Sequence, residues 1–151
     1  MNKRNTIYTF VLPMLVVVSA VISGCTLETS GNGKLDGYWH LMEVDTISSG
    51  GKCDMSQRRV FWGIQAKIIN ISDRDNTSCD FSFRFEETNS MLRLYAPFVH
   101  DRSVGDTAVD DATLLAPFGL DSLEQGFKIE MLKSGTMRLA TEKLKLHFKK
   151  M

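Results

Sequence analysis

Catalytic residue types are scarce in this chain of 151 residues. Its three histidines, His40, His100 and His147, lie far apart in the sequence and outside nucleophile-elbow, zinc-helix and phosphate-loop motifs. His100 is followed by Asp101 and Ser103, but side chains so close along one irregular segment rarely align for proton transfer. We therefore expect no enzymatic activity and no cofactor.

An excess of charge of one sign is also missing, because 18 basic residues balance 18 acidic ones. The basic residues near the C-terminus alternate with apolar ones, which is typical of the wet side of a strand, so we expect no nucleic-acid partner. The acidic residues between positions 101 and 111 lack the spacing of a calcium-binding loop, so we expect no metal site. The two groups are Lys143, Lys145, Lys149 and Lys150, and Asp101, Asp106, Asp110 and Asp111.

The apolar segment of residues 6–22 is too short and wrongly flanked to span a membrane stably. Lys3 and Arg4 precede it, and Ser23, Gly24 and Cys25 close it. This ending resembles the lipobox of bacterial lipoproteins. The resemblance implies cleavage after residue 24 and acyl chains on Cys25 that anchor the protein to a membrane. An ordinary secretory signal and a true anchor helix are the alternatives.

The residues after Cys25 bear on where such a lipoprotein resides. Thr26 stands where an Asp would indicate inner-membrane retention, which favours the outer membrane. Glu28 is the only acidic residue nearby, which favours an orientation toward the periplasm. We therefore expect a lipid-anchored protein of the cell envelope, at the outer membrane and facing the periplasm, with exposure at the cell surface as the alternative.

The chain divides into three parts. Residues 1–24 form the predicted signal peptide, residues 25–34 a polar, glycine-containing tether, and residues 35–151 one folded domain. Removal of the signal leaves 127 residues, and because it takes away only Lys3 and Arg4, the formal net charge falls from zero to −2.

Two cysteines remain besides Cys25, namely Cys53 and Cys79. An even pair in a secreted domain suggests a disulfide, and two separate thiols are the alternative. Neither cysteine has another cysteine or a histidine at zinc-ligand spacing, so zinc is not expected there.

Alternation of apolar and polar residues dominates the folded domain and predicts strands with one dry face. No long amphipathic helix interrupts the strands, and short polar turns join them, so neighbouring strands should be antiparallel. We expect an all-β up-and-down meander of about eight strands that closes into a barrel. A two-sheet β-sandwich is the alternative. The alternating segments are residues 38–44, 60–68, 81–86, 92–95, 127–131, 137–139 and 144–149.

Gly37, Tyr38 and Trp39 open the first of these strands. They resemble the Gly-x-Trp signature of lipocalins. Together with the lipobox, the tether and the last strand, they make residues 35–151 similar to small lipocalin-like lipoproteins of Bacteroidetes. The resemblance implies a meander barrel in which Gly37 permits tight chain entry and Trp39 plugs the floor. Arg138 is one candidate for the basic residue that usually covers this tryptophan.

Residues 96–126 break the alternation for longer than a hairpin requires, and loops this long are often functional. Asp110 or Asp111 is placed to cap a helical turn through Ala112, Leu114 and Leu115, whose apolar side would cover one barrel opening. The loop is then a lid or a partner contact. A solvated insertion with a few hydrophobic anchors is the alternative.

Two functions compete at this point. In the first, the barrel binds a small apolar or amphipathic ligand. In the second, a solidly packed barrel docks another envelope component, as an accessory protein or inhibitor, through the 96–126 loop or its outer face. Large side chains in every layer of the interior favour the second function. The residues predicted to line an internal ligand site are Trp62, Phe81, Phe83, Phe85, Leu115 and Phe118.

Overall fold

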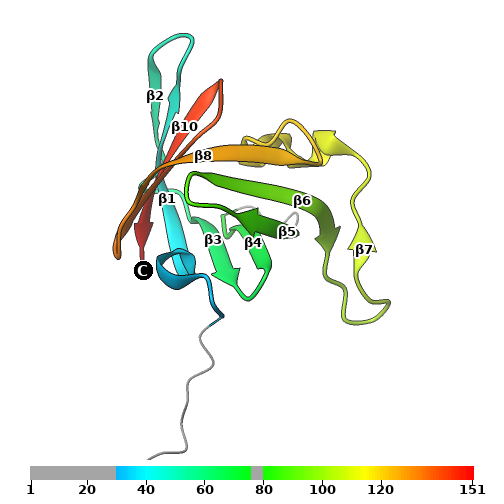
Figure 1. Cartoon of the computed structure of the whole chain (residues 1–151). Coiled ribbons are helices and arrows are strands. Elements are labelled where there is room, and N and C mark those ends of the chain that lie inside the picture. The colour runs from blue at the N-terminus through cyan, green and yellow to red at the C-terminus, as the bar shows by residue number, and fades with distance from the viewer. Residues whose placement is uncertain (1–29, 76–79) are drawn as a thin grey trace, which may run out of the picture.

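The computed structural model describes residues 30–75 and 80–151, and the regular secondary structure of this part of the chain consists mainly of β-strands (Figure 1). Two short 3₁₀ helices, η2 (Gly33–Leu35) and η3 (Ala112–Phe118), accompany the strands. Within these residues, no helix is long and apolar enough to cross a membrane. The strands are β1 (Gly37–Thr46), β2 (Gly51–Asp54), β3 (Val60–Gln65), β4 (Ile68–Asp73), β5 (Phe81–Glu87), β6 (Met91–Val99), β7 (Thr107–Ala108), β8 (Gln125–Leu132), β9 (Thr136–Ala140) and β10 (Leu144–Lys150).

The strands form one closed antiparallel barrel. Eight of them follow one another around it in the order β1, β3, β4, β5, β6, β8, β9 and β10, and β10 then pairs with β1. The short strand β2 pairs with the second half of β1, and β7 pairs with the end of β6. The predicted all-β meander is therefore confirmed, and closure through the β1–β10 pair excludes the sandwich.

Alternation along the strands fills the barrel with apolar side chains. In β3, Val60, Trp62 and Ile64 are buried, and in β5 the same holds for Phe81, Phe83 and Phe85. Burial of such side chains is the main stabilising term of the fold. The largest fully buried side chains are Trp39, Trp62, Phe83, Phe85 and Phe127.

Both ends of the barrel are covered. At the end where β1 begins and β10 finishes, here called the closed end, η2 buries Leu35 completely beside the chain entry. At the opposite end, η3 and the residues after it bury Leu115 and Leu120. The carboxylate of Asp111 accepts a hydrogen bond from the Thr113 amide at 2.9 Å, so this residue, and not Asp110, caps the predicted helical turn.

The expected strand over residues 60–68 is wrong in its second half. The chain turns back at Ala66 and Lys67, where Ala66 takes a left-handed conformation with φ of 52°. A two-residue turn pairs Ile64 with Ile69, and the inward side of the strand therefore passes from even to odd positions. Ile69 is buried as a result, whereas Ile68 is 39% exposed.

The predicted 96–126 loop is also shorter than expected. Strand β6 continues to Val99 beyond a bulge at Ala96, whose φ is 47°. Strand β7 then pairs beside it, so only part of the segment is irregular.

Candidate functional site

The six residues predicted to line an internal ligand site lie together in the core. Trp62 packs its ring against Phe127 and Phe148, at centroid distances of 5.7 and 5.0 Å. Phe118 of η3 meets Phe81 edge to face at 5.4 Å. None of the six residues lines the three surface clefts of the described structure. Five of the six are buried, and Phe118 is half-buried against them; their role in ligand binding stays a prediction.

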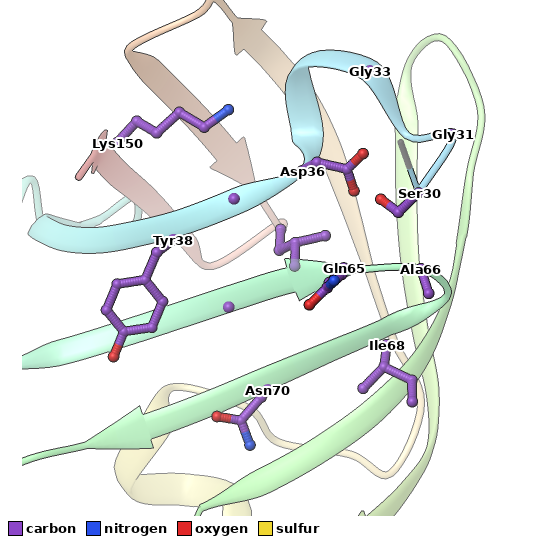
Figure 2. Close-up of a pocket in the computed structure, with 13 residues that line it drawn as sticks. Ser30, Gly31, Gly33, Asp36, Tyr38, Gln65, Ala66, Ile68, Asn70 and Lys150 are labelled. Atoms are coloured by element: carbon purple, nitrogen blue, oxygen red, sulfur yellow. The ribbon is translucent and has the colours of Figure 1, made fainter. Parts of the chain in front are cut away.

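The largest of these clefts, of about 1220 Å³, lies on the outer wall at the closed end (Figure 2). The start of β1, the β3–β4 hairpin and residues 30–36 surround it, and we call it the closed-end cleft. Figure 2 shows the Tyr38 ring and the Asn70 amide at one end and the Asp36 carboxylate at the other. The lining residues are Ser30, Gly31, Gly33, Asp36, Gly37, Tyr38, Gly63, Ile64, Gln65, Ala66, Ile68, Asn70 and Lys150.

A glycine in β3 gives the cleft its flat floor. Gly63 pairs with Tyr38 across the two strands, and a Cβ atom on Gly63 would lie 3.5 Å from the tyrosine ring. The other neighbour of this ring is Phe61, which stacks on it with centroids 4.8 Å apart. Tyr38 is consequently held as a platform at the rim while 38% of its surface remains exposed.

One buried polar side chain fixes the wall of the cleft. Asn32, only 6% exposed, donates through Nδ2 to the carbonyl of Ala66 at 2.5 Å and to Asp36 Oδ1 at 2.7 Å. Its Oδ1 accepts from Lys67 Nζ at 2.9 Å. These bonds tie the chain entry to the β3–β4 hairpin. The described part of the predicted tether is therefore attached to the barrel through Asn32.

Asp36 remains a carboxylate in this arrangement. Burial alone would raise its pKa, but hydrogen bonds from Ser30 and Asn32 outweigh that effect and hold the pKa below the ordinary value of 3.8. The Lys150 ammonium acts in the same direction. The carboxylate is thus committed to the chain's own donors, and it is poorly placed to act as a general acid or base.

The basic residue that covers the barrel-floor tryptophan is Lys150, and Arg138 was the wrong candidate. Lys150 Nζ lies 4.9 Å from the centroid of the Trp39 ring, whose Nε1 donates to the carbonyl of Leu35 at 2.8 Å. Arg138 instead points outward from β9, since its neighbours Met137 and Leu139 are the buried ones. The inward side of β10 runs Leu144, Leu146, Phe148 and Lys150, and this alternation is the signal that sequence reasoning missed.

The predicted tight chain entry at Gly37 has a visible cause. Its φ is 128°, and a Cβ atom there would lie 2.5 Å from Lys150 Cε. The lysine can therefore cross the barrel floor only above a residue without a side chain.

The cysteine predictions reach beyond the described residues. Cys53 lies exposed in β2, whereas Cys79 and Cys25 fall outside the described part of the chain. The Cys53–Cys79 disulfide and the lipidation of Cys25 stay predictions.

The closed-end cleft itself was not foreseen. Its lining comes from two turns and from the outward side of three strands, which in sequence resemble ordinary solvated positions.

Comparisons with known proteins agree with this architecture. The model of the lipocalin-like domain family matches residues 20–151. A search of the curated proteins found no match.

Two solved structures share the fold. A lipocalin-like protein from Bacteroides uniformis is 21% identical with a TM-score of 0.60, and the match covers 79% of this chain and 100% of that one. An uncharacterized protein from Bacteroides eggerthii is 22% identical with a TM-score of 0.53, and the match covers 77% of this chain and 98% of that one. On the breadth of the family match and this shared barrel, the chain belongs to the lipocalin-like domain family.

Proposed function

We propose that the protein is a non-enzymatic binding protein of the bacterial cell envelope, anchored by acyl chains on Cys25, that holds a small amphipathic ligand in the closed-end cleft. The observation that carries this proposal is the closed-end cleft, because the interior of the barrel is filled. Trp39 and Leu35 occupy one end, Leu115 and Leu120 the other, and all four are at most 1% exposed. A ligand inside would have to displace side chains, whereas the closed-end cleft already opens to solvent on the outer wall.

The chemistry of the cleft defines the ligand class. Its apolar surface comes from Tyr38 and Ile68, which expose 38% and 39% of their area, and from the glycine floor. A mostly apolar site with a few polar groups is the usual form of a small-molecule site. Because Asp36 is occupied by the chain's own donors, Gln65 and Asn70 supply the polar contacts. Amides favour neutral hydroxyl or amide groups on the ligand.

The position of the cleft suits an anchored protein. Ser30 lines it and lies five positions after Cys25 in the sequence, a reach of at most about 18 Å for extended chain. Acyl chains on Cys25 would therefore keep the cleft close to the lipid headgroups. Amphipathic molecules concentrate in that interfacial layer.

Docking of another envelope protein is the second candidate function. It is favoured by Val104 and Leu114, which are 78% and 52% exposed on the segment between β6 and β8. Exposed apolar side chains on a long connecting segment suit a partner contact.

Native mass spectrometry of the full chain, expressed with its signal and purified from solubilised membranes, tests both candidates. We expect the acylated protein to carry a small molecule that Tyr38→Ala loses and Leu114→Ser keeps. Loss of the molecule in Phe118→Ala but not in Tyr38→Ala would place it inside the barrel and refute the cleft. An empty protein that captures a partner through Leu114 would favour docking, and a mature terminus without acyl mass would refute the anchor.

A further inference from the structure

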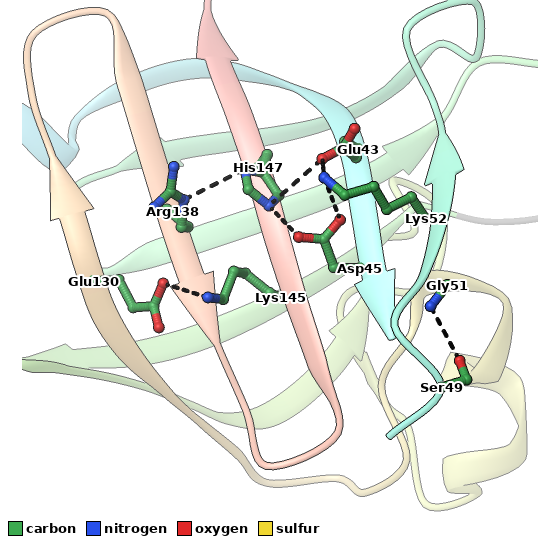
Figure 3. A network of polar contacts seen from close by, with 9 residues as sticks. All are labelled: Glu43, Asp45, Ser49, Gly51, Lys52, Glu130, Arg138, Lys145 and His147. Atoms are coloured by element: carbon green, nitrogen blue, oxygen red, sulfur yellow. Dashed lines mark hydrogen bonds and ion pairs between the residues drawn. The ribbon is translucent and has the colours of Figure 1, made fainter. Parts of the chain in front are cut away.

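The seam where β1 meets β10 carries two carboxylates and a histidine on the outer wall (Figure 3). Glu43 pairs directly with His147 across the strands, and Asp45 follows two residues later on the same side of β1. His147 Nε2 lies 2.9 Å from Asp45 Oδ2 and 3.9 Å from Glu43 Oε1. One ligand atom from each of the three side chains lies within 4.8 Å of the others. The paired backbone therefore brings three metal-ligating groups to one point.

One oxygen of this group lacks a hydrogen bond. Asp45 Oδ1 is buried and has no hydrogen-bond partner. The ammonium of Lys52 lies 3.6 Å away, beyond hydrogen-bonding distance, and contacts Glu43 Oε1 at 3.0 Å. The Asp45 side chain as a whole is 22% exposed, but a shielded acceptor atom without a hydrogen bond is uncommon, and an ion is one of its explanations.

We propose that Glu43, Asp45 and His147 form a zinc site, and that the Lys52 ammonium takes the place of the ion when no metal is bound. Zinc accepts imidazole nitrogen and carboxylate oxygen ligands at about 2.0–2.2 Å, which sets neighbouring ligand atoms about 3.3 Å apart. The observed separations of 2.9 and 3.9 Å require only small side-chain movements to reach that value. The imidazole selects a transition metal over calcium or magnesium, and water completes the shell on the open wall.

Lys52 can leave without disturbing the core. Its side chain is 65% exposed and comes from β2, which pairs with β1 but lies outside the eight-strand barrel. An exposed ion pair contributes little stability, so a divalent ion can displace the ammonium into solvent.

The second nitrogen of His147 imposes a further condition. Arg138 Nε lies 3.4 Å from Nδ1 and donates to it, so the ring proton resides on Nε2 and is donated to Asp45. Zinc can bind Nε2 only when the ring proton has moved from Nε2 to Nδ1, because this transfer frees the Nε2 lone pair. The guanidinium must then turn away, because two donors cannot face each other.

If these side chains form only an ion-pair network and no zinc site, replacing Lys52 should have a different effect on zinc binding. In that case, removing the ammonium takes a cation away from Glu43 and Asp45 and creates no metal affinity. Under our proposal, the same change frees the ligands and strengthens zinc binding. Lys145 provides a stringent control, because it lies directly opposite Asp45 in the β1–β10 pair but directs its ammonium to Glu130, at 3.1 Å.

Isothermal titration calorimetry of the full chain with zinc chloride decides between these readings. All variants carry Cys53→Ser so that this exposed thiol cannot bind the metal. We expect one zinc ion per chain, about fivefold tighter binding in Lys52→Met, and unchanged binding in Lys145→Met. Loss of binding in both His147→Gln and Asp45→Asn assigns the ligands.

Thermal unfolding gives a second readout. Because the ligands join the first and last strands, zinc should raise the melting temperature of the parent protein but not that of His147→Gln. Absence of zinc binding in the parent, binding that survives His147→Gln, or equal affinity with and without Lys52 would overturn the proposal.

Discussion

Lys150 Nζ lies over the ring of Trp39, 4.9 Å from its centroid, and 3.2 Å from the carbonyl oxygen of Lys34. The second-last residue of the chain thereby covers the tryptophan at the start of the barrel. Figure 1 shows the C-terminus beside the chain entry, as this contact requires. The contact closes the barrel at the end where the closed-end cleft lies.

Replacing Lys150 should destabilise the barrel. Lys150→Met removes the cation from the buried ring and should lower the free energy of unfolding by about 0.5–2 kcal/mol, measured in urea. Lys150→Arg keeps a cation over the ring and should retain most of that stability. Equal loss in both variants would show that packing, and not charge, is what Trp39 requires.

Gly37→Ala tests the crossing of the lysine over the chain entry. The new methyl group would meet Lys150 Cε at 2.5 Å in a backbone region that is strained for alanine. We expect a loss of about 1–3 kcal/mol in the same urea assay. Gly33→Ala is the control, because Gly33 also has a positive φ but nothing lies within 4 Å of its would-be Cβ. The excess loss in Gly37→Ala reports the more strained backbone at φ of 128° together with the displacement of Lys150, and no excess would contradict both.

The Asn32 hydrogen bonds should matter more than their position near the chain entry suggests. Asn32→Ala leaves the Ala66 carbonyl, Lys67 and Asp36 without their shared partner, and we expect a loss of about 1–3 kcal/mol. Hydrogen exchange should show faster opening of the β3–β4 hairpin. In Asn70→Ala only one long bond, 3.3 Å to Ser82, is lost, so this control should change the stability far less.

Protonation of Asp36 at low pH should destabilise the closed end of the barrel. Because its pKa is lower in the folded protein than in the unfolded chain, its contribution is complete above the ordinary pKa of 3.8 and is lost as the pH falls through the folded value. Urea unfolding at a series of pH values from 5 down to 3 should show a steeper loss in the wild type than in Asp36→Asn. Parallel curves would remove Asp36 from the acid response.

The cap of η3 gives a local test at the opposite end of the barrel. Asp111→Ala should cost about 1 kcal/mol, because it removes the acceptor for the Thr113 amide. Asp110→Ala, at the exposed preceding residue, should cost much less. Comparable losses in the two variants would contradict the assignment of the cap, and circular dichroism should show an unchanged strand content in both.

The sequence by itself determined the fold class and most of the core. Alternation with a period of two identifies the side of a strand that faces a dry interior, and the predicted dry sides that carry Trp62 and the stripe Phe81, Phe83 and Phe85 are buried in the structure. It also indicated a turn capped by Asp110 or Asp111, since capping depends on residues adjacent in the chain, and the structure selects Asp111. The hairpin at Ala66 was missed because nothing local to an alanine and a lysine announces a left-handed turn.

Only the tertiary structure decided which residues meet across the barrel. Lys150 reaches Trp39 and His147 reaches Glu43 because the last strand pairs with the first, and the register of that pair depends on the closure of all eight strands. The closed-end cleft has the same origin, since the chain entry, one hairpin and the outward side of three strands adjoin only after closure. Local periodicity specifies which way a side chain faces, whereas its partners across the sheet are specified by the packing of the whole barrel.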